Sequence, residues 1–325
     1  MVNVAINGIG RIGKAVLKIC LEKKINVVAI NDLTPIESMV YLLKYDSVYG
    51  NYEEKVETGK DFLKIGSQKI KVFNETNPEN LPWKELKVDV VIESTGIFTD
   101  REGAQKHINA GAKKVIISAP AKNPDVTIVL GVNDKDLKKE HKVISMASCT
   151  TNCLAPIAKI LNEEFGIEKG FMTTIHAYTN DQKILDVSHK KLRRGRAGAI
   201  NLIPTSSGAT TSVSEVIPEL KGKMNGLAVR APVACGSLVD FTAELKRKTS
   251  VEEINKSMKK ASEKLKGILQ YTNDEIVSSD IIKNPHTSIF DSTLTQVNGN
   301  LVKVFSWYDN EYGYSCKIVD LIKKL

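Results

Sequence analysis

The first half of the chain alternates short apolar runs with segments of helical periodicity. The runs are rich in valine and isoleucine, and they cover residues 2–6, 25–30, 88–92, 115–118, 126–130 and 143–146. Such runs are typical of strands that are buried on both faces of a sheet. Between the first two runs, residues 11–22 carry apolar side chains at helical spacing. This alternation predicts an α/β fold with a doubly wound parallel sheet.

Two further helices are predicted from their end signals. Thr99 and Glu102 form a capping box, and Gly111 is placed to end the helix that follows. Residues 150–165 predict a second helix, which ends at Gly166. Pro156 lies inside this helix, where a missing amide leaves the carbonyl of Asn152 without its usual partner, so we expect a kink.

The pattern changes in the second half, where strands with alternating faces are predicted at residues 171–178, 226–232, 236–245, 288–291 and 301–307. Ser250 and Glu253 form a capping box for a helix over 250–266, and residues 315–325 predict a last helix. These elements indicate an α+β domain with a mixed or antiparallel sheet. Since 325 residues are many for one core, we expect a dinucleotide-binding domain at 1–148, completed by a helix at 313–325, and a catalytic domain at 149–312.

The composition excludes several other classes of protein. Hydrophobic residues make up 42% of the chain, and no apolar stretch is long enough to span a bilayer. The N-terminus lacks the features of a signal peptide, and five widely spaced cysteines do not predict a disulfide framework, so we expect a cytoplasmic protein. The net charge of +8 favours anionic ligands, and the basic run at 190–196 could also attract nucleic acid. We expect no metal site.

A glycine motif follows the first predicted strand and opens the first predicted helix. Gly8, Gly10 and Gly13 have the spacing G-x-G-x-x-G, in which the glycines allow a tight turn, a close approach of the backbone to a pyrophosphate, and close helix–strand packing. Amides at the helix start would face the phosphates. The motif is weak by itself, but in this context it indicates a Rossmann-type domain.

Asp32 follows the second predicted strand, about 20 positions after the motif, where a carboxylate accepts hydrogen bonds from the adenosine ribose. The alternative is a turn or helix-capping residue, because Leu33, Thr34 and Pro35 follow. Together with the glycines, Asp32 favours cofactor binding. A carboxylate there would repel a 2′-phosphate, and so it favours NAD.

Cys149 lies where a predicted strand ends and a predicted helix begins. Free amides and the helix dipole at such a position lower the pKa of a thiol, and the thiolate is the reactive form. The alternative, a buried structural cysteine, suits Cys153 better. His176 lies in a threonine-rich strand, where a histidine is more often structural, and spacing alone does not select it. The other four histidines, His107, His141, His189 and His286, have no setting that suggests a function.

Several motifs resemble those of one enzyme family from end to end. They are NGIGRIGK, LLKYDSVYG, ASCTTNCLAP, TIHAYTNDQ, LRRGRAGAINLIPT and WYDNEYGYS. With them the chain resembles glyceraldehyde-3-phosphate dehydrogenases, which are typically cytoplasmic homotetramers of glycolysis or gluconeogenesis. The resemblance implies that Cys149 attacks an aldehyde to give a thiohemiacetal, with His176 as general base. Hydride transfer to the nicotinamide then leaves a thioester, which inorganic phosphate attacks to give an acyl phosphate.

The resemblance also implies the residues that bind cofactor and phosphate. Those for the cofactor are Gly8, Gly10, Arg11, Ile12, Gly13, Asp32, Thr76, Thr95, Gly96, Ser118, Ser188 and Asn310, with Asn310 orienting the nicotinamide carboxamide. Thr179, Arg194 and Arg230 resemble the site for the phosphate of the substrate. Ser148, Thr150, Ser207 and Gly208 resemble the site for the attacking phosphate. Arginine suits bidentate phosphate recognition, which gives part of the basic run a specific use.

Some positions depart from the family pattern. Ser207 replaces a threonine but keeps the hydroxyl, Thr76 stands where an arginine is usual, and Tyr312 replaces a common tryptophan. Residues 231–236 also differ, beside Arg230. Ser188 resembles NADP-accepting members, whereas Asp32 and Leu33 favour NAD, so we expect NAD preference with possible use of NADP.

Three functions are compatible with these features. The first is the phosphorylating dehydrogenase acting on D-glyceraldehyde 3-phosphate. The second is the related erythrose-4-phosphate dehydrogenase, which shares the cysteine chemistry but releases an acid by hydrolysis. The third is a redox-sensing or RNA-binding protein on the same fold, against which the intact Cys149, His176 and glycine motif argue.

Overall fold

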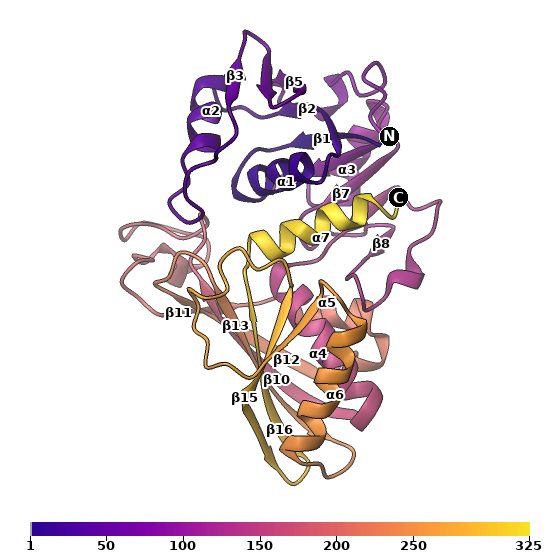
Figure 1. The fold of residues 1–325 in the computed structure, drawn as a ribbon, viewed down its shortest axis with the longest axis vertical. Coiled ribbons are helices and arrows are strands. Elements are labelled where there is room, and N and C mark those ends of the chain that lie inside the picture. The colour runs from indigo at the N-terminus through magenta and orange to yellow at the C-terminus, as the bar shows by residue number, and fades with distance from the viewer. Residues whose placement is uncertain (1) are drawn as a thin grey trace. The chain divides into compact units, whose positions relative to one another are not determined.

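The computed structural model describes residues 2–325, which form two compact units. Unit 1 comprises residues up to Ile128, then Lys135–Ala147 and Ser315–Leu325, and unit 2 comprises Val129–Asp134 and Ser148–Tyr314. Figure 1 follows the chain through both. Each unit has its own sheet, and the predicted fold class, a parallel-rich sheet followed by a mixed one, is confirmed. The expected domain boundaries at 148/149 and 312/313 stay a prediction.

Unit 1 is built on a nine-stranded sheet of order β3-β4-β5-β2-β1-β6-β7-β9-β8. Its strands are β1 (Asn3–Asn7), β2 (Asn26–Asn31), β3 (Val56–Thr58), β4 (Phe62–Ile65), β5 (Gln68–Phe73), β6 (Val90–Glu93), β7 (Lys114–Ile117), β8 (Val126–Thr127) and β9 (Val143–Ser145). From β5 to β8 all neighbours are parallel, and β3 and β4 form an antiparallel edge. The central strands β1, β6 and β7 are almost wholly buried, as their valine- and isoleucine-rich sequences require.

The helices of unit 1 are α1 (Arg11–Glu22), α2 (Ile36–Lys44), α3 (Arg101–Asn109) and the short 3-10 helix η1 (Pro78–Asn80). Helix α1 packs against β1 and β2, and α3 packs against β7 and β9. The predicted capping box at Thr99 is wrong by one residue. The side chain of Asp100 caps α3 instead, accepting a hydrogen bond from the amide of Gly103 at 2.7 Å. Both residues can cap a helix, and the sequence pattern did not distinguish them.

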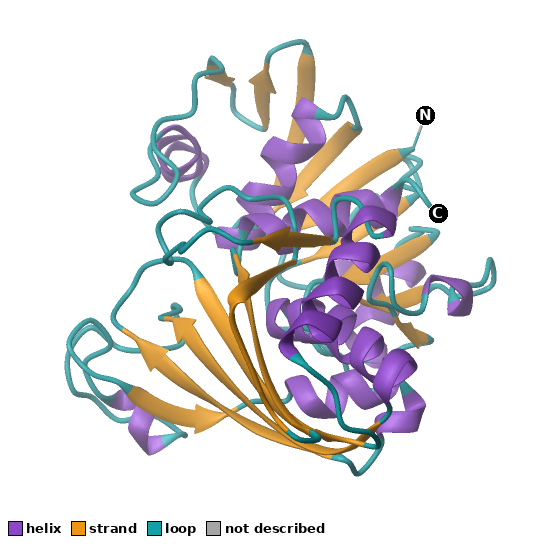
Figure 2. Cartoon of the chain, turned by 60° about the horizontal axis from the view of Figure 1, so that its bottom comes forward, coloured by secondary structure: helices purple, strands orange, loops and turns teal. Residues whose placement is uncertain are grey.

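Unit 2 contains a seven-stranded mixed sheet of order β11-β12-β10-β13-β16-β15-β14. The strands are β10 (Ile167–Ala177), β11 (Ile203–Ser206), β12 (Met224–Ala231), β13 (Ser237–Leu245), β14 (Leu269–Thr272), β15 (Ser288–Asn298) and β16 (Leu301–Tyr308). Its helices are α4 (Cys149–Phe165), α5 (Ala209–Val216), α6 (Val251–Lys264), η3 (Leu192–Gly195) and η4 (Pro218–Leu220). Helices α4, α5 and α6 gather along one face of this sheet (Figure 2).

Two elements span the division between the units, η2 (Asp134–Asp136) and the last helix α7 (Tyr312–Ile322). Helix α7 starts and ends earlier than predicted. Strand β8 is also shorter than the predicted strand at 126–130. The capping box of Ser250 and Glu253 is confirmed by a hydrogen bond from the Glu253 amide to the Ser250 hydroxyl at 3.2 Å. Helix α4 runs through Pro156 to Phe165. No helix within residues 2–325 is long and apolar enough to cross a bilayer.

Candidate active site

The glycine motif forms the turn between β1 and α1, as predicted from its spacing. Gly8 has a φ of +91°, and a Cβ there would lie 2.7 Å from the amide nitrogen of Thr95. A Cβ on Gly13 would overlap the carbonyl oxygen of Gly8. By contrast, the space around Gly10 is open, with nothing within 4 Å of a Cβ position. Two glycines are therefore required by the turn itself, and the third leaves a bare backbone surface that a pyrophosphate can approach.

Asp32 follows β2 and joins it to this turn. Its Oδ2 accepts a hydrogen bond from the amide of Ile9 at 2.6 Å, and its Oδ1 accepts one from the amide of Thr34 at 2.8 Å. The carboxylate therefore has the turn role that the sequence left open. It also keeps further lone pairs for ribose hydroxyls, so the two roles are compatible.

The other predicted cofactor residues fall into two groups. In unit 1, Thr76, Thr95, Gly96 and Ser118 lie near the carboxyl ends of parallel strands, where dinucleotides bind in such sheets. The side chain of Arg11 is occupied by an ion pair with Asp46 at 2.7 Å, which leaves the main chain of Arg11 and Ile12 for any phosphate.

Two predicted cofactor residues belong to unit 2. Ser188 is exposed. Asn310 is 5% exposed, and its Oδ1 accepts hydrogen bonds from the amide of Gly236 at 3.2 Å and the hydroxyl of Ser237 at 2.9 Å. This orientation leaves the Nδ2 of Asn310 without a hydrogen-bond partner among the described residues. It is thereby available as a donor, as recognition of a carboxamide oxygen requires.

Cys149 is the first residue of α4, and Ser148 is its N-cap, accepting a hydrogen bond from the Thr151 amide at 3.0 Å. Cys149 is partly exposed, whereas the four other cysteines are buried. Cys153, one turn further, points its sulfur at the carbonyl of Ser306, 3.4 Å away. Only Cys149 therefore combines access with the free amides of a helix start.

His176 lies within hydrogen-bonding distance of Cys149, with 3.5 Å between Nε2 and Sγ. This contact joins α4 to β10 and answers the question that the sequence left open. The other ring nitrogen, Nδ1, lies 2.6 Å from the carbonyl oxygen of Ala177 and 2.6 Å from an Nη of Arg230. These two partners require opposite roles of Nδ1. The carbonyl oxygen needs Nδ1 to donate a proton, whereas the guanidinium needs Nδ1 to accept one. The position of Arg230 thus influences which nitrogen of His176 carries the proton.

The electrostatics of this pair combine burial with positive charge. Burial raises the pKa of the Cys149 thiol, and the charge of Arg230 and the amide of Thr150 act in the opposite direction. The helix-start argument alone, which predicted a lowered pKa, therefore gave too little weight to burial. Burial and the charge of Arg230 lower the pKa of His176 to about 3. The imidazole is consequently neutral above that pH and can act as a general base toward the thiol.

The predicted substrate-phosphate site is centred on Arg230, which pairs with His176 across the parallel strands β12 and β10. Its Nε is buried and has no hydrogen-bond partner among residues 2–325, a cost that an anion would remove. Arg194 is partly neutralised by an ion pair with Asp181, and its Nε donates to the hydroxyl of Thr205 at 2.9 Å. Thr179 follows the end of β10, and its amide donates a hydrogen bond to the Oε1 of Gln182 at 3.3 Å.

The predicted residues for attacking phosphate lie at the starts of two packed helices, α4 and α5. Thr150 donates to or accepts from the hydroxyl of Tyr308 at 2.8 Å, and Ser207 accepts from the amide of Ala209 at 3.2 Å. Gly208 follows and is exposed, next to the first turn of α5. Two helix starts with free amides form a suitable setting for an anion.

Tyr308 is a site residue that the sequence analysis did not select. Its buried hydroxyl bonds both Thr150 and Thr174 at 2.8 Å, and its ring meets that of His176 edge-on, with 5.9 Å between centroids. Tyr308 therefore supports both the base and the helix start that carries Cys149. It falls within the motif WYDNEYGYS, and the alternation of β16 places it on the buried face.

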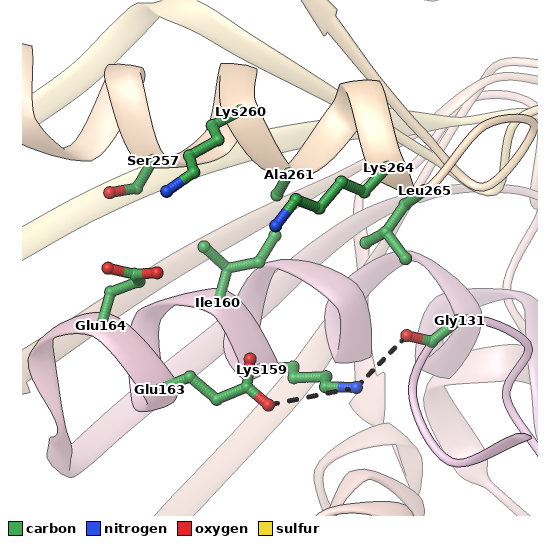
Figure 3. A pocket seen from close by; sticks show the side chains of 10 residues that line it. All are labelled: Gly131, Lys159, Ile160, Glu163, Glu164, Ser257, Lys260, Ala261, Lys264 and Leu265. Carbon is green, nitrogen blue, oxygen red and sulfur yellow. Dashed lines mark hydrogen bonds and ion pairs between the residues drawn. The ribbon is translucent and has the colours of Figure 1, made fainter. Parts of the chain in front are cut away.

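A separate pocket of about 190 Å³ lies between α4 and α6 (Figure 3). Lysines and glutamates line it, including Lys159, which donates to the carbonyl of Val132 at 2.8 Å. It contains none of the predicted site residues. Within residues 2–325, no group of three or more His, Cys, Asp or Glu residues is arranged to hold a metal ion.

A Rossmann-type unit followed by a unit with a paired cysteine and histidine is an arrangement that suits an oxidoreductase. The comparisons with known proteins make this specific. The family model "Glyceraldehyde 3-phosphate dehydrogenase, NAD binding domain" matches residues 2–101, and "Glyceraldehyde 3-phosphate dehydrogenase, C-terminal domain" matches residues 148–310. The chain belongs to the glyceraldehyde-3-phosphate dehydrogenase family.

Relatives match along nearly the whole chain. The glyceraldehyde-3-phosphate dehydrogenase of Borreliella burgdorferi is 56% identical, over 99% of each chain. That of Geobacillus stearothermophilus is 55% identical over 98% of this chain and 97% of its own. That of Thermotoga maritima is 55% identical over 100% of this chain and 99% of its own.

Proposed function

We propose that the chain is a phosphorylating glyceraldehyde-3-phosphate dehydrogenase. It converts D-glyceraldehyde 3-phosphate and inorganic phosphate to 1,3-bisphosphoglycerate and reduces NAD. The observation that carries this proposal is the 3.5 Å contact between Cys149 and His176, with Arg230 beside the histidine. A nucleophile, its base and a phosphate-binding cation are thereby brought together in one unit.

The residues of this site account for each stage of the reaction. Cys149 forms a bond to the aldehyde carbon while its thiol proton passes to Nε2 of His176, and the same nitrogen returns the proton to the developing alkoxide. His176 then takes the hydroxyl proton of the thiohemiacetal as the carbonyl re-forms. When bound, NAD supplies the hydride acceptor for this oxidation. Phosphate held near the starts of α4 and α5 attacks the resulting thioester, and the sulfur of Cys149 leaves.

We propose NAD as the preferred cofactor, held in unit 1 by the bare turn at Gly10 and by Asp32. Asp32 is the main support, because its carboxylate would repel the 2′-phosphate of NADP. The exposed Ser188 leaves use of NADP open. Comparing kcat/KM for the two cofactors tests this proposal, and a clear preference for NADP would refute the argument from Asp32.

Phosphate dependence separates the main proposal from erythrose-4-phosphate dehydrogenase. NADH formation from glyceraldehyde 3-phosphate should require inorganic phosphate for sustained turnover. Equal turnover without phosphate, together with faster oxidation of erythrose 4-phosphate, would favour the alternative. The RNA-binding alternative is weakened by the basic run itself, because Arg194 and Arg196 are paired with Asp181 and Asp186.

We also propose that the protein is a homotetramer of the cytoplasm. Large apolar side chains of the segment 184–202 are more than half exposed, namely Ile184, Leu185, Val187, Leu192, Ile200 and Leu202. Phe171 on β10 is 68% exposed as well. So many exposed apolar groups favour association with further copies. Five free cysteines suit a reducing compartment. Light scattering coupled to size exclusion measures the assembly, and a monomer at micromolar concentration would contradict it.

A further inference from the structure

Buried polar side chains meet where the central strands of unit 1 end. Asn7, Asn31 and Glu93 are the last residues of β1, β2 and β6, and His107 reaches them from α3. Each is 4% exposed or less. Burying four polar side chains at one place is costly unless every group is satisfied, and the satisfied arrangement then has one geometry.

Glu93 accepts four hydrogen bonds. Its Oε1 accepts from the amide of Thr95 at 2.8 Å and from the hydroxyl of the same residue. Its Oε2 accepts from the Nδ2 of Asn7 at 2.6 Å and from the Nε2 of His107 at 3.1 Å. One carboxylate accepts from all four donors, so it sets the orientation of the side chains of Asn7, Thr95 and His107.

The contact between Glu93 and His107 is a hydrogen bond and not an ion pair. The indole Nε1 of Trp83 lies 3.0 Å from the Nδ1 of His107, and an indole nitrogen can only donate. Nδ1 therefore carries no proton, and the imidazole is neutral with its proton on Nε2. No cation compensates Glu93 in this network, which is held by hydrogen bonds alone.

The hydrogen bonds continue from β1 through β2 to the segment that follows β5. With its Nδ2 directed at Glu93, Asn7 turns its Oδ1 to the Nδ2 of Asn31, 2.7 Å away. Asn31 in turn clasps the backbone of Glu75, accepting from its amide and donating to its carbonyl, each at 2.9 Å. One chain of hydrogen bonds thus runs from Thr95 to Glu75.

Four main-chain segments that this network holds lead directly into a predicted cofactor residue or contain one. Asn7 precedes Gly8, Asn31 precedes Asp32, Glu75 precedes Thr76, and Glu93 binds Thr95. The first and last of these segments also touch directly, because Gly8 leaves no room for a Cβ beside the Thr95 amide. Ser94 adds a hydrogen bond to the carbonyl of Gly8 at 2.8 Å.

We infer that Glu93 is a positioning residue for the dinucleotide, acting through the segments that this network joins. This inference rests on the proposed function, since it concerns the cofactor of that reaction. Glu93 itself does not touch the cofactor in this scheme. Its acceptor-only carboxylate holds the Thr95 turn against the glycine turn, and through Asn7 and Asn31 it sets the positions of Asp32 and Thr76.

The test is Glu93→Gln, which keeps the shape but replaces one acceptor oxygen with a donor. Two of the four donors then face an NH₂ group, so the Thr95 turn or the Asn7 link must shift. We expect NAD to bind at least about tenfold more weakly by calorimetry, because small displacements of positioning groups have effects of this order. At saturating NAD, kcat and the KM for aldehyde should stay within about twofold of wild type. In the cofactor-free protein, the amides of Thr95 and Ile97 should exchange hydrogen faster.

Two controls separate positioning from general stability. Val115→Ala removes apolar packing from the same core, where Val115 is fully buried, without touching the network. Trp83→Phe removes the donor to the Nδ1 of His107 and leaves the three donors from Asn7 and Thr95 on Glu93. Both should lower the melting temperature while NAD affinity stays within about twofold. If Glu93→Gln does not fold, Asn31→Ala replaces it, with weaker NAD binding and faster exchange at the Glu75 amide as the expected result.

The outcomes are distinguishable. Unchanged NAD affinity in the folded network variant, or an equal loss in Val115→Ala at a matched melting temperature, would overturn the inference. Binding of NADP but not NAD by the wild-type protein would instead refute the proposed cofactor, and failure to bind either would refute the proposed function.

Discussion

Replacing His176 with asparagine should separate the base from the nucleophile. Asparagine can occupy the same place on β10 and form a hydrogen bond, but it cannot accept a proton near neutral pH. Nε2 of His176 lies 3.5 Å from the sulfur of Cys149, and the lowered pKa of about 3 keeps the imidazole unprotonated throughout the assay range. General-base catalysis of this kind contributes about 10²–10⁴-fold, or roughly 3–5 kcal/mol of barrier. We expect kcat/KM to fall by that factor, with NAD affinity unchanged.

The same variant should change the pH dependence of alkylation at Cys149. Burial raises the pKa of this thiol, so without the imidazole the reactive thiolate forms only as the pH rises into the alkaline range. Iodoacetamide should therefore react more slowly with His176→Asn at pH 7, and the two rates should converge as the pH rises into the alkaline range. Cys153→Ala in both backgrounds removes the thiol one helical turn from Cys149, and the three other cysteines, Cys20, Cys235 and Cys316, are buried. Superimposable pH profiles for the two proteins would refute the pairing of Cys149 with His176.

Three shorter predictions concern the turn, the helix cap and the nucleophile. Gly13→Ala should lower stability by about 1–3 kcal/mol and weaken NAD binding, because its Cβ meets a backbone carbonyl, whereas Gly10→Ala has room and should fold normally; melting curves and calorimetry compare them. Asp100→Ala should cost about 1 kcal/mol in urea unfolding and Thr99→Ala much less, and the reverse order would restore the capping box. Cys149→Ser should bind NAD but show no burst of NADH in rapid mixing, and a full burst would move the nucleophile elsewhere.

The parts of the fold that sequence predicts are those with strong local patterns. The buried strands β1, β2, β6 and β7 read as apolar runs, and α1 shows its full length through spacing. The edge strands β3 and β4 were missed because they are short and partly exposed, so their sequences mix charged and apolar residues. Helix α2 was missed as well, since only Met39 and Leu43 of its nine residues are buried.

The candidate site also has parts that are local in sequence and parts that depend on the pairing of distant strands. The glycine turn and the helix start at Cys149 are contiguous in sequence, because free amides and tight turns are properties of a few adjacent residues. The neighbours of His176, by contrast, are distant from it in sequence. Arg230 comes from β12, 54 residues later, and only the register of two parallel strands brings it beside the imidazole.

The pairing of distant strands therefore sets the electrostatics around Cys149, while local structure sets the position of Cys149 in the fold. Cys149 owes its position to α4, but the charge that opposes the effect of burial on its pKa belongs to Arg230. A one-residue slip between β10 and β12 would turn Arg230 to the opposite face of the sheet and leave the thiol with burial alone. Substitutions that disturb this pairing, such as a side chain on Gly226, whose Cβ would lie 2.5 Å from the carbonyl of Met172, should then reduce the reactivity of Cys149 without contact with it.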